Sequence, residues 1–206
     1  MEPVIIQGRT LGKTWWAKAW NQNLESYADY SSRIARGRSY VRKGAVLDLK
    51  ISKGEARALV RGSASKPYLV IIHIDPLKKE KWSRVTELCN NRIDNLEQLL
   101  DGKFPKELEV LFTDKEYGLF PSPKEIYFDC TCPDWAYMCK HVAAVLYGIG
   151  ARLDSDPLLF FELRDLDVKA LLKKSMEKRL DNMLKNAENK SEREISPEDV
   201  FDIFGI

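Results

Sequence analysis

Residues 130–141 read Cys130-Thr131-Cys132-Pro133-Asp134-Trp135-Ala136-Tyr137-Met138-Cys139-Lys140-His141, the pattern C-x-C-x6-C-x-H. The chain has 206 residues but only four Cys and two His, so this short segment holds four of those six side chains. Three thiolates and one imidazole are the closed ligand set of a tetrahedral structural zinc site, in which no position remains for a catalytic water. We therefore predict one structural Zn²⁺ ion bound by Cys130, Cys132, Cys139 and His141. The alternative is that these are ordinary buried side chains.

The spacing of these ligands also predicts the local structure around them. Residues two apart in an extended strand point to the same side, so Cys130 and Cys132 can approach one ion from a strand end. Two positions in a helix are about 200° apart, so Cys139 and His141 converge only where a helix begins close to Cys139. We expect a strand over 125–129, a loop over 133–138, and a buried helix that ends at Gly148 or Gly150.

Upstream of this segment, the sequence predicts a helix followed by a small sheet. Thr14 is suited to cap a helix whose apolar stripe is formed by Trp16, Trp20, Leu24 and Tyr27. Three later segments have the apolar pattern of strands, and their short connections favour an antiparallel meander. The predicted strands are 46–51, 56–61 and 68–74.

Alternation along these strands predicts which side chains face the solvent. Leu47, Leu49 and Ile51 are expected together on the buried face of the first strand. The opposite face of the sheet would carry the basic residues Lys50, Arg57 and Arg61.

Positive charge is concentrated in the first third of the chain. The formal net charge is only +2, yet residues 8–66 contain 13 Lys and Arg against 4 Asp and Glu. Guanidinium and ammonium groups bind phosphate oxygens with a salt-dependent affinity. The candidate nucleic-acid-binding residues are Arg36, Arg38, Arg42, Lys43, Arg57, Arg61 and Lys140. The alternative is a solvated basic edge, and Lys140 would equally balance the charge of the zinc thiolates.

The predicted elements together indicate an α+β protein. We expect an N-terminal helix with an antiparallel β meander in a basic module (1–75), a helical linker region (76–124), a zinc finger (125–152) and a helical C-terminal region (153–206). Within the last two helical regions, the patterns favour helices at 76–102, 105–112, 168–186 and 197–204.

The segment that contains the four candidate ligands resembles the SWIM zinc finger, including Pro133-Asp134-Trp135 and Lys140-His141-Val142-Ala143-Ala144. The resemblance extends to the prokaryotic SWIM-finger proteins and covers most of residues 8–175. It rests on Gly12–Trp16, Arg36–Arg42, Val60–Ser63, Leu119–Ser122 and Asp156–Phe160. The resemblance implies a ββα-type zinc module that binds DNA or protein. It also implies association with helicase-like ATPases of the Swi/Snf class.

These features favour binding rather than catalysis. The sequence contains no Walker-type phosphate loop, paired-carboxylate motif or nucleophile elbow. In one hypothesis the basic residues bind DNA. In another the chain is an adaptor for the ATPase, and Trp135 and Tyr137 contact a partner or bases instead of packing over the thiolates. A thiol-dependent enzyme that pairs Cys89 with His73 is the weakest alternative, since no orienting group or oxyanion loop is evident.

Other classes of protein are disfavoured by the composition. No run of 18 uncharged apolar residues occurs, and the first residues lack the layout of a signal peptide. Four Cys in a chain of this length also argue against a disulfide scaffold. We therefore expect a cytoplasmic protein without a membrane or small-molecule partner.

Overall fold

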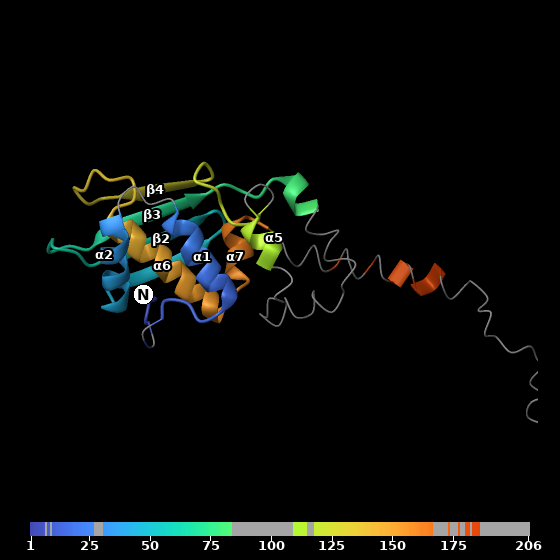
Figure 1. Ribbon diagram of the computed structural model, residues 1–206, viewed down its shortest axis with the longest axis horizontal. Coiled ribbons are helices and arrows are strands. Elements are labelled where there is room, and N and C mark those ends of the chain that lie inside the picture. Colours follow the sequence, from blue (N-terminus) through green and yellow to red (C-terminus); the bar gives the residue numbers. More distant parts are fainter. Residues whose placement is uncertain are drawn as a thin grey trace, which may run out of the picture. The chain divides into compact units, whose positions relative to one another are not determined.

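The structure, a computed structural model, combines a four-stranded antiparallel sheet with helices, as expected of an α+β protein (Figure 1). It describes residues 1–6, 8, 10–26, 31–83, 109–114 and 118–166, with the further positions 173, 177, 180, 181 and 183–185. The elements are α1 (Trp15–Glu25), α2 (Ser31–Arg42), β1 (Val46–Ser52), β2 (Glu55–Val60), β3 (Tyr68–Ile74), α5 (Glu109–Thr113), β4 (Ile126–Cys130), α6 (Lys140–Ser155) and α7 (Leu159–Leu163).

The sheet has the order β1-β2-β3-β4, and each neighbouring pair is antiparallel, which confirms the predicted meander. The predicted buried face of β1 is wrong in detail. A bulge between Val46 and Asp48 shifts the alternation, so Val46 and Leu49 are buried while Leu47 and Ile51 are only half-buried. Lys50, Arg57 and Arg61 are exposed, as predicted.

Helix α6 contacts all four strands and lies between α1 and α2 beneath the sheet (Figure 1). Helix α1 begins as predicted, because the Thr14 hydroxyl accepts a hydrogen bond from the backbone N–H of Ala17 at 3.3 Å. Trp20 and Leu24 are buried, whereas Trp16 is half-buried and donates its indole N–H to the carbonyl of Leu153. Tyr27 lies outside the described residues.

Helix α2 was not predicted, since its sequence indicated only a basic stretch. Its buried stripe consists of just three residues, Ile34, Gly37 and Val41, at helical spacing. Gly37 allows α2 to cross α6 closely, because a Cβ added there would lie 2.5 Å from the Cβ of Ala143. The absence of a side chain at Gly37 therefore permits the close approach of the two helices.

Helix α6 begins where the ligand spacing placed it, but its predicted end at Gly148 or Gly150 is wrong. The helix continues to Ser155. Both glycines face close neighbours: a Cβ at Gly148 would lie 3.2 Å from Cγ2 of Val4, and a Cβ at Gly150 would lie 2.6 Å from Oδ1 of Asn21. These glycines permit tight packing inside the helix instead of terminating it.

Arg164 is a fully buried charge just after α7. Its guanidinium contacts a carboxylate oxygen of Glu125 at 3.1 Å and donates to the backbone carbonyl of Asp75 at 2.9 Å. Burial alone would raise the pKa of Glu125, but hydrogen bonds from Ser122 and the charge of Arg164 outweigh it and lower that pKa. These contacts connect Arg164, just after α7, to Asp75, which follows β3, and to Glu125, which precedes β4.

The contacts divide the chain into two units, Met1–Val168 and Lys169–Ile206. In the first unit, segments 1–75 and 125–152 share one core, because β4 pairs with β3. The boundaries that we expected between the four segments of the chain stay a prediction. In the second, the described positions are helical and fall within the predicted helix over 168–186. Predictions over 84–108 and 186–206 lie outside the described residues. In the described part, no helix is both long and apolar enough to cross a membrane.

Candidate metal centre

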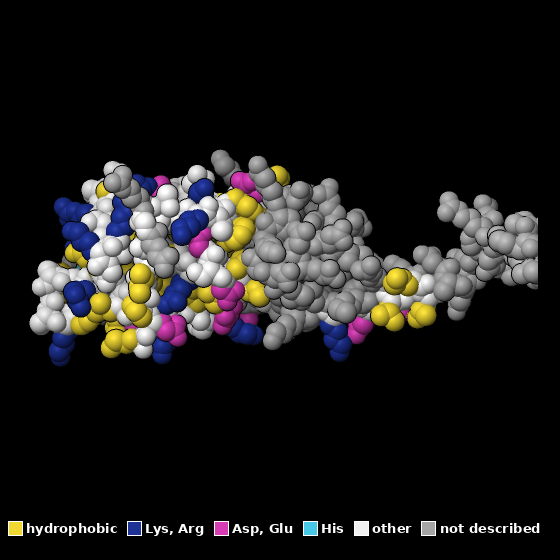
Figure 2. Space-filling view, turned by 90° about the horizontal axis from the view of Figure 1, so that it is seen from below, with side chains coloured by type: hydrophobic (Ala, Val, Ile, Leu, Met, Phe, Trp, Pro, Cys, Tyr) yellow, Lys and Arg dark blue, Asp and Glu magenta, His cyan; other side chains and the backbone are white. Residues whose placement is uncertain are grey.

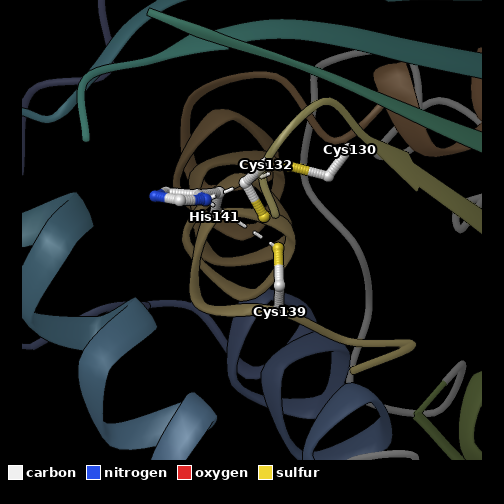
Figure 3. A group of neighbouring side chains, drawn as sticks. All are labelled: Cys130, Cys132, Cys139 and His141. Atoms are coloured by element: carbon white, nitrogen blue, oxygen red, sulfur yellow. Dashed lines mark hydrogen bonds between the residues drawn. The ribbon is translucent and has the colours of Figure 1, made fainter. Parts of the chain in front are cut away.

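The first two ligands come from the end of β4. Cys130 is the last residue of that strand, paired in register with Val70 of β3. The backbone N–H of Thr131 still donates to the carbonyl of Leu69 at 3.1 Å, and the chain then bends over residues 131–133. The side chains of Cys130 and Cys132 lie close together at this strand end, as Figure 3 shows.

The other two ligands come from the start of α6. Cys139 is the N-cap residue, with extended backbone (φ −70°, ψ 168°), and its sulfur accepts from the backbone N–H of Val142 at 3.5 Å. His141 follows in the first turn, and its Nδ1 lies 3.9 Å from the sulfurs of both Cys139 and Cys130. The predicted convergence is confirmed: all four donor atoms lie within 4.8 Å of one another (Figure 3).

The arrangement fits a tetrahedral zinc ion. Bond lengths of about 2.3 Å to sulfur and about 2.0 Å to nitrogen place tetrahedral S and N ligands about 3.5 Å apart, close to the 3.9 Å separations observed. The set of three sulfurs and one imidazole suits zinc and is closed once all four bind. Cys130, Cys132, Cys139 and His141 would hold the ion, which would cross-link the end of β4 to the start of α6.

The electrostatics of the cluster favour one thiolate, that of Cys139. A hydrogen bond with Cys130 lowers the pKa of Cys139 to about 4, and the same interaction raises the pKa of Cys130. Burial raises the pKa of Cys132. Without metal the cluster thus concentrates its negative charge on Cys139, at the positive end of α6. A dication would bring the three thiolates to a net charge of −1, next to Lys140.

His141 is buried between two tyrosine rings. The imidazole lies 5.4 Å from Tyr40 of α2 and 4.6 Å from Tyr68 of β3, measured between ring centroids. Its second nitrogen, Nε2, is buried and has no hydrogen-bond partner among the described residues. A Cβ at Gly62 would lie 2.9 Å from Nε2 and would also overlap the ring of Tyr68, so this position has no room for a side chain.

The comparisons with known proteins agree with this geometry. Residues 129–148 match the SWIM zinc finger family. The chain is also 35% identical over 163 residues to "Uncharacterized protein Rv2102" of Mycobacterium tuberculosis (strain ATCC 25618 / H37Rv). That match covers 79% of this chain and 58% of the relative, so the chain spans less than two thirds of the relative's length. No solved structure matches the chain.

The loop of the SWIM finger, residues 133–138, is fixed to α2 and to β4. Asp134 pairs with Arg33 at 3.0 Å and accepts from the backbone N–H of Ala136. Burial would raise the pKa of Asp134, but these two interactions outweigh it and lower that pKa. The ring of Tyr137 packs against that of Phe128 at a tilt, and its hydroxyl donates to the carbonyl of Ile126. The sequence did not predict this role for Arg33.

The two aromatic candidates of the SWIM loop differ in position. Trp135 is 79% exposed, so most of its indole lies in solvent rather than over the thiolates. Tyr137 is 50% exposed, but its hydroxyl is bonded to β4. Ala136 and Met138 are buried beneath them. Trp135 is therefore presented by a loop that is anchored on both sides.

The structure gathers some of the candidate basic residues around the SWIM finger. Arg36, Arg42 and Lys43 are exposed on α2 and the turn after it. Lys140 lies above the ring of Tyr40, with its Nζ 6.0 Å from the ring centroid. Arg61 is also exposed. Its backbone N–H donates to the carbonyl of Ala45, just after the end of α2, which places Arg61 near that end of the helix. Lys and Arg side chains gather at the end of the molecule that holds α2, at the left of Figure 2.

Other candidate residues lie elsewhere or are engaged. Arg38 is half-buried between Glu25 at 2.5 Å and the hydroxyl of Tyr147 at 2.8 Å, and these partners raise its pKa. Arg57 is exposed on the face of the sheet opposite α6, where it contacts Glu55 at 3.2 Å.

Only one of the two residues of the enzymatic alternative lies among the described residues. His73 is exposed at the sheet surface, with Nδ1 3.5 Å from a carboxylate oxygen of Glu55. Cys89 lies outside the described residues.

Proposed function

We propose that this chain is a non-enzymatic cytoplasmic module in which one structural zinc ion supports a DNA-binding surface, and that it serves as an accessory to a Swi/Snf-class helicase-like ATPase. The zinc neutralises the thiolates and holds the SWIM loop and α6 in one arrangement. Structural sites of this kind contribute on the order of 10 kcal/mol to the folding of their modules.

The contacts between α2 and the SWIM finger carry the proposal. Arg33 of α2 pairs with Asp134 of the loop, and Tyr40 of α2 packs on the ligand His141. The exposed side of α2 meanwhile carries Arg36 and Arg42. Because the metal ligands and the basic helix touch directly, bound zinc would also hold the phosphate-binding side chains in place.

Charge reversal on this surface tests the proposal. We select Arg36, Arg42 and Lys43, and leave Arg38 unchanged because its reversal would break the contacts with Glu25 and Tyr147. The control reverses three exposed lysines outside α2 and the finger, which changes the net charge by the same amount. The controls are Lys18, Lys79 and Lys124.

Binding to a DNA duplex is measured by fluorescence anisotropy across a salt series. Three lost phosphate contacts should reduce the slope of log affinity against log salt by about 2.7, and the lysine control should keep the slope of the unmodified chain. An affinity that is flat across salt, or an equal loss in both variants, would contradict the proposal. Zinc content by elemental analysis and circular dichroism verify that each variant is folded.

A protein–protein adaptor is the second candidate, and the 79% exposure of Trp135 favours it. Exposed tryptophans often act as anchor residues in protein interfaces. If the chain is an adaptor without nucleic-acid contact, the zinc-loaded protein captures the Swi/Snf-class ATPase, and Trp135→Ala abolishes capture while the charge reversals do not. An ATPase that is never recovered, with or without zinc, counts against this candidate and against the accessory role.

A further inference from the structure

We infer that the SWIM loop and one side of α2 form a site for single-stranded nucleic acid, in which Trp135 stacks on an unpaired base while Arg36 and Lys43 contact the backbone. The inference rests on the proposed function and specifies which form of nucleic acid the surface binds.

Trp135 has the exposure and the support that a stacking residue needs. Its indole is 79% exposed, whereas Ala136 and Met138 on the same loop are buried. The loop is bounded by the candidate ligands Cys132 and Cys139 and is pinned at Asp134. Stacking a base on such a fixed ring costs little conformational entropy, because the loop is already ordered.

The arrangement of charges on α2 directs a strand toward this loop. Lys43 follows the last residue of α2, and its backbone N–H still donates to the carbonyl of Ser39 at 3.1 Å. With about 100° per residue continued to this position, Arg36 and Lys43 lie on one ridge, on the side of α2 that also holds Arg33 and Tyr40. Arg33 and Tyr40 are the residues that touch the SWIM finger, so this ridge borders it. Arg42 lies about 180° around the helix from Arg33. It points to the opposite side of the exposed face.

The ridge is long enough for several nucleotides. Ten residues separate Arg33 from Lys43, which corresponds to about 15 Å along the helix axis. Lys140 and Arg61 add positive charge beside this ridge, at Tyr40 and near the end of α2. Asp134, the acidic residue of the SWIM loop, is neutralised by Arg33 at 3.0 Å, so it presents little repulsion to a phosphate.

An exposed indole beside a basic ridge distinguishes a single strand from other partners. In a duplex both faces of each base are covered by neighbouring pairs, so Trp135 would have no surface on which to stack. A protein partner would use the indole but has no general need for the phosphate-binding side chains. A single strand uses both features together, as is common among proteins that bind single strands through stacking and charge.

The test uses the full zinc-loaded chain and two fluorescent probes, an oligothymidine of about 15 nucleotides and a duplex of the same length. We expect tighter binding to the oligothymidine. Trp135→Ala should weaken that binding by about 5- to 150-fold and leave duplex binding unchanged, while Trp135→Phe retains most of the affinity. Lys43→Glu should lower the salt slope by about 0.7, and Lys18→Glu, at an exposed position of α1, serves as the matched control with an unchanged slope.

The outcomes separate this inference from the function on which it rests. Equal or tighter binding to the duplex, with no effect of Trp135→Ala, overturns the single-strand site and leaves the proposed DNA-binding function standing. If neither probe binds the folded, zinc-loaded chain, both are refuted. Loss of ATPase capture by Trp135→Ala without loss of oligothymidine binding assigns the indole to a protein partner and overturns the inference.

Discussion

Replacing Gly37 by alanine tests how α2 is held against α6. In an exposed helix this change stabilises by about 1 kcal/mol, because glycine is a poor helix former. Here the new Cβ would lie 2.5 Å from the Cβ of Ala143 and 3.0 Å from the backbone nitrogen of Ala144. Carbon atoms in contact need about 3.5–4.0 Å. Since α6 backbone cannot yield as a flexible side chain does, α2 itself must move away.

The size of the effect follows from two opposing contributions. Overpacking of a close contact costs about 1–3 kcal/mol, and a clash with backbone falls near the upper end of that range. After subtracting the helix-propensity gain, we expect the free energy of unfolding to fall by about 2 kcal/mol. The displacement should also separate Tyr40 from His141 and Arg33 from Asp134, so the affinity for zinc should decrease.

Urea unfolding of the zinc-loaded chain measures the stability change, and competition with a chelator measures the zinc affinity. Ala35→Gly is the matched control, since Ala35 is exposed on the same helix and should lose about 1 kcal/mol through propensity alone. If Gly37→Ala instead raises the free energy of unfolding by an amount that mirrors this control, α2 and α6 do not meet as closely as the structure indicates.

Four further predictions follow from the metal centre and the buried ion pair. Removing zinc with a chelator, or changing Cys139→Ser, should lower the thermal midpoint and abolish stoichiometric zinc, whereas Cys89→Ser should keep the zinc content measured by elemental analysis. Gly62→Ala should weaken zinc binding in a chelator titration, because its Cβ would crowd the histidine ligand at 2.9 Å; unchanged affinity would exclude this crowding. Arg164→Ala should cost about 3–5 kcal/mol in urea unfolding, because it leaves the carboxylate of Glu125 without its buried partner. Because the folded-state pKa of Glu125 is lowered, its contribution to stability is present above the ordinary carboxylate pKa and is lost as the pH falls through the lowered value. Glu125→Gln should therefore flatten the acid limb of a stability–pH profile, and a limb of unchanged steepness would contradict this assignment.

Local patterns predicted the metal centre and the elements that carry it. The spacing of Cys130, Cys132, Cys139 and His141 required a strand end and a helix start, and β4 and α6 supply them. The three earlier strands followed from their apolar patterns, and the start of α1 followed from its cap at Thr14. Each of these features depends on residues within a few positions of one another, which is why the sequence alone was sufficient.

Contacts between distant segments decided the rest. Helix α2 escaped prediction because its packing depends on Gly37, a residue without a side chain, against Ala143 more than a hundred positions away. The sequence predicted a helix end at Gly150, but in the folded chain a Cβ at this position would clash with Asn21. The glycine therefore permits close packing within the helix. The ion pair between Arg33 and Asp134 likewise joins two segments that are far apart in the sequence, and no local pattern around either residue predicts the other as its partner. Packing and charge pairing act through space, so their partners become evident only once the chain is folded.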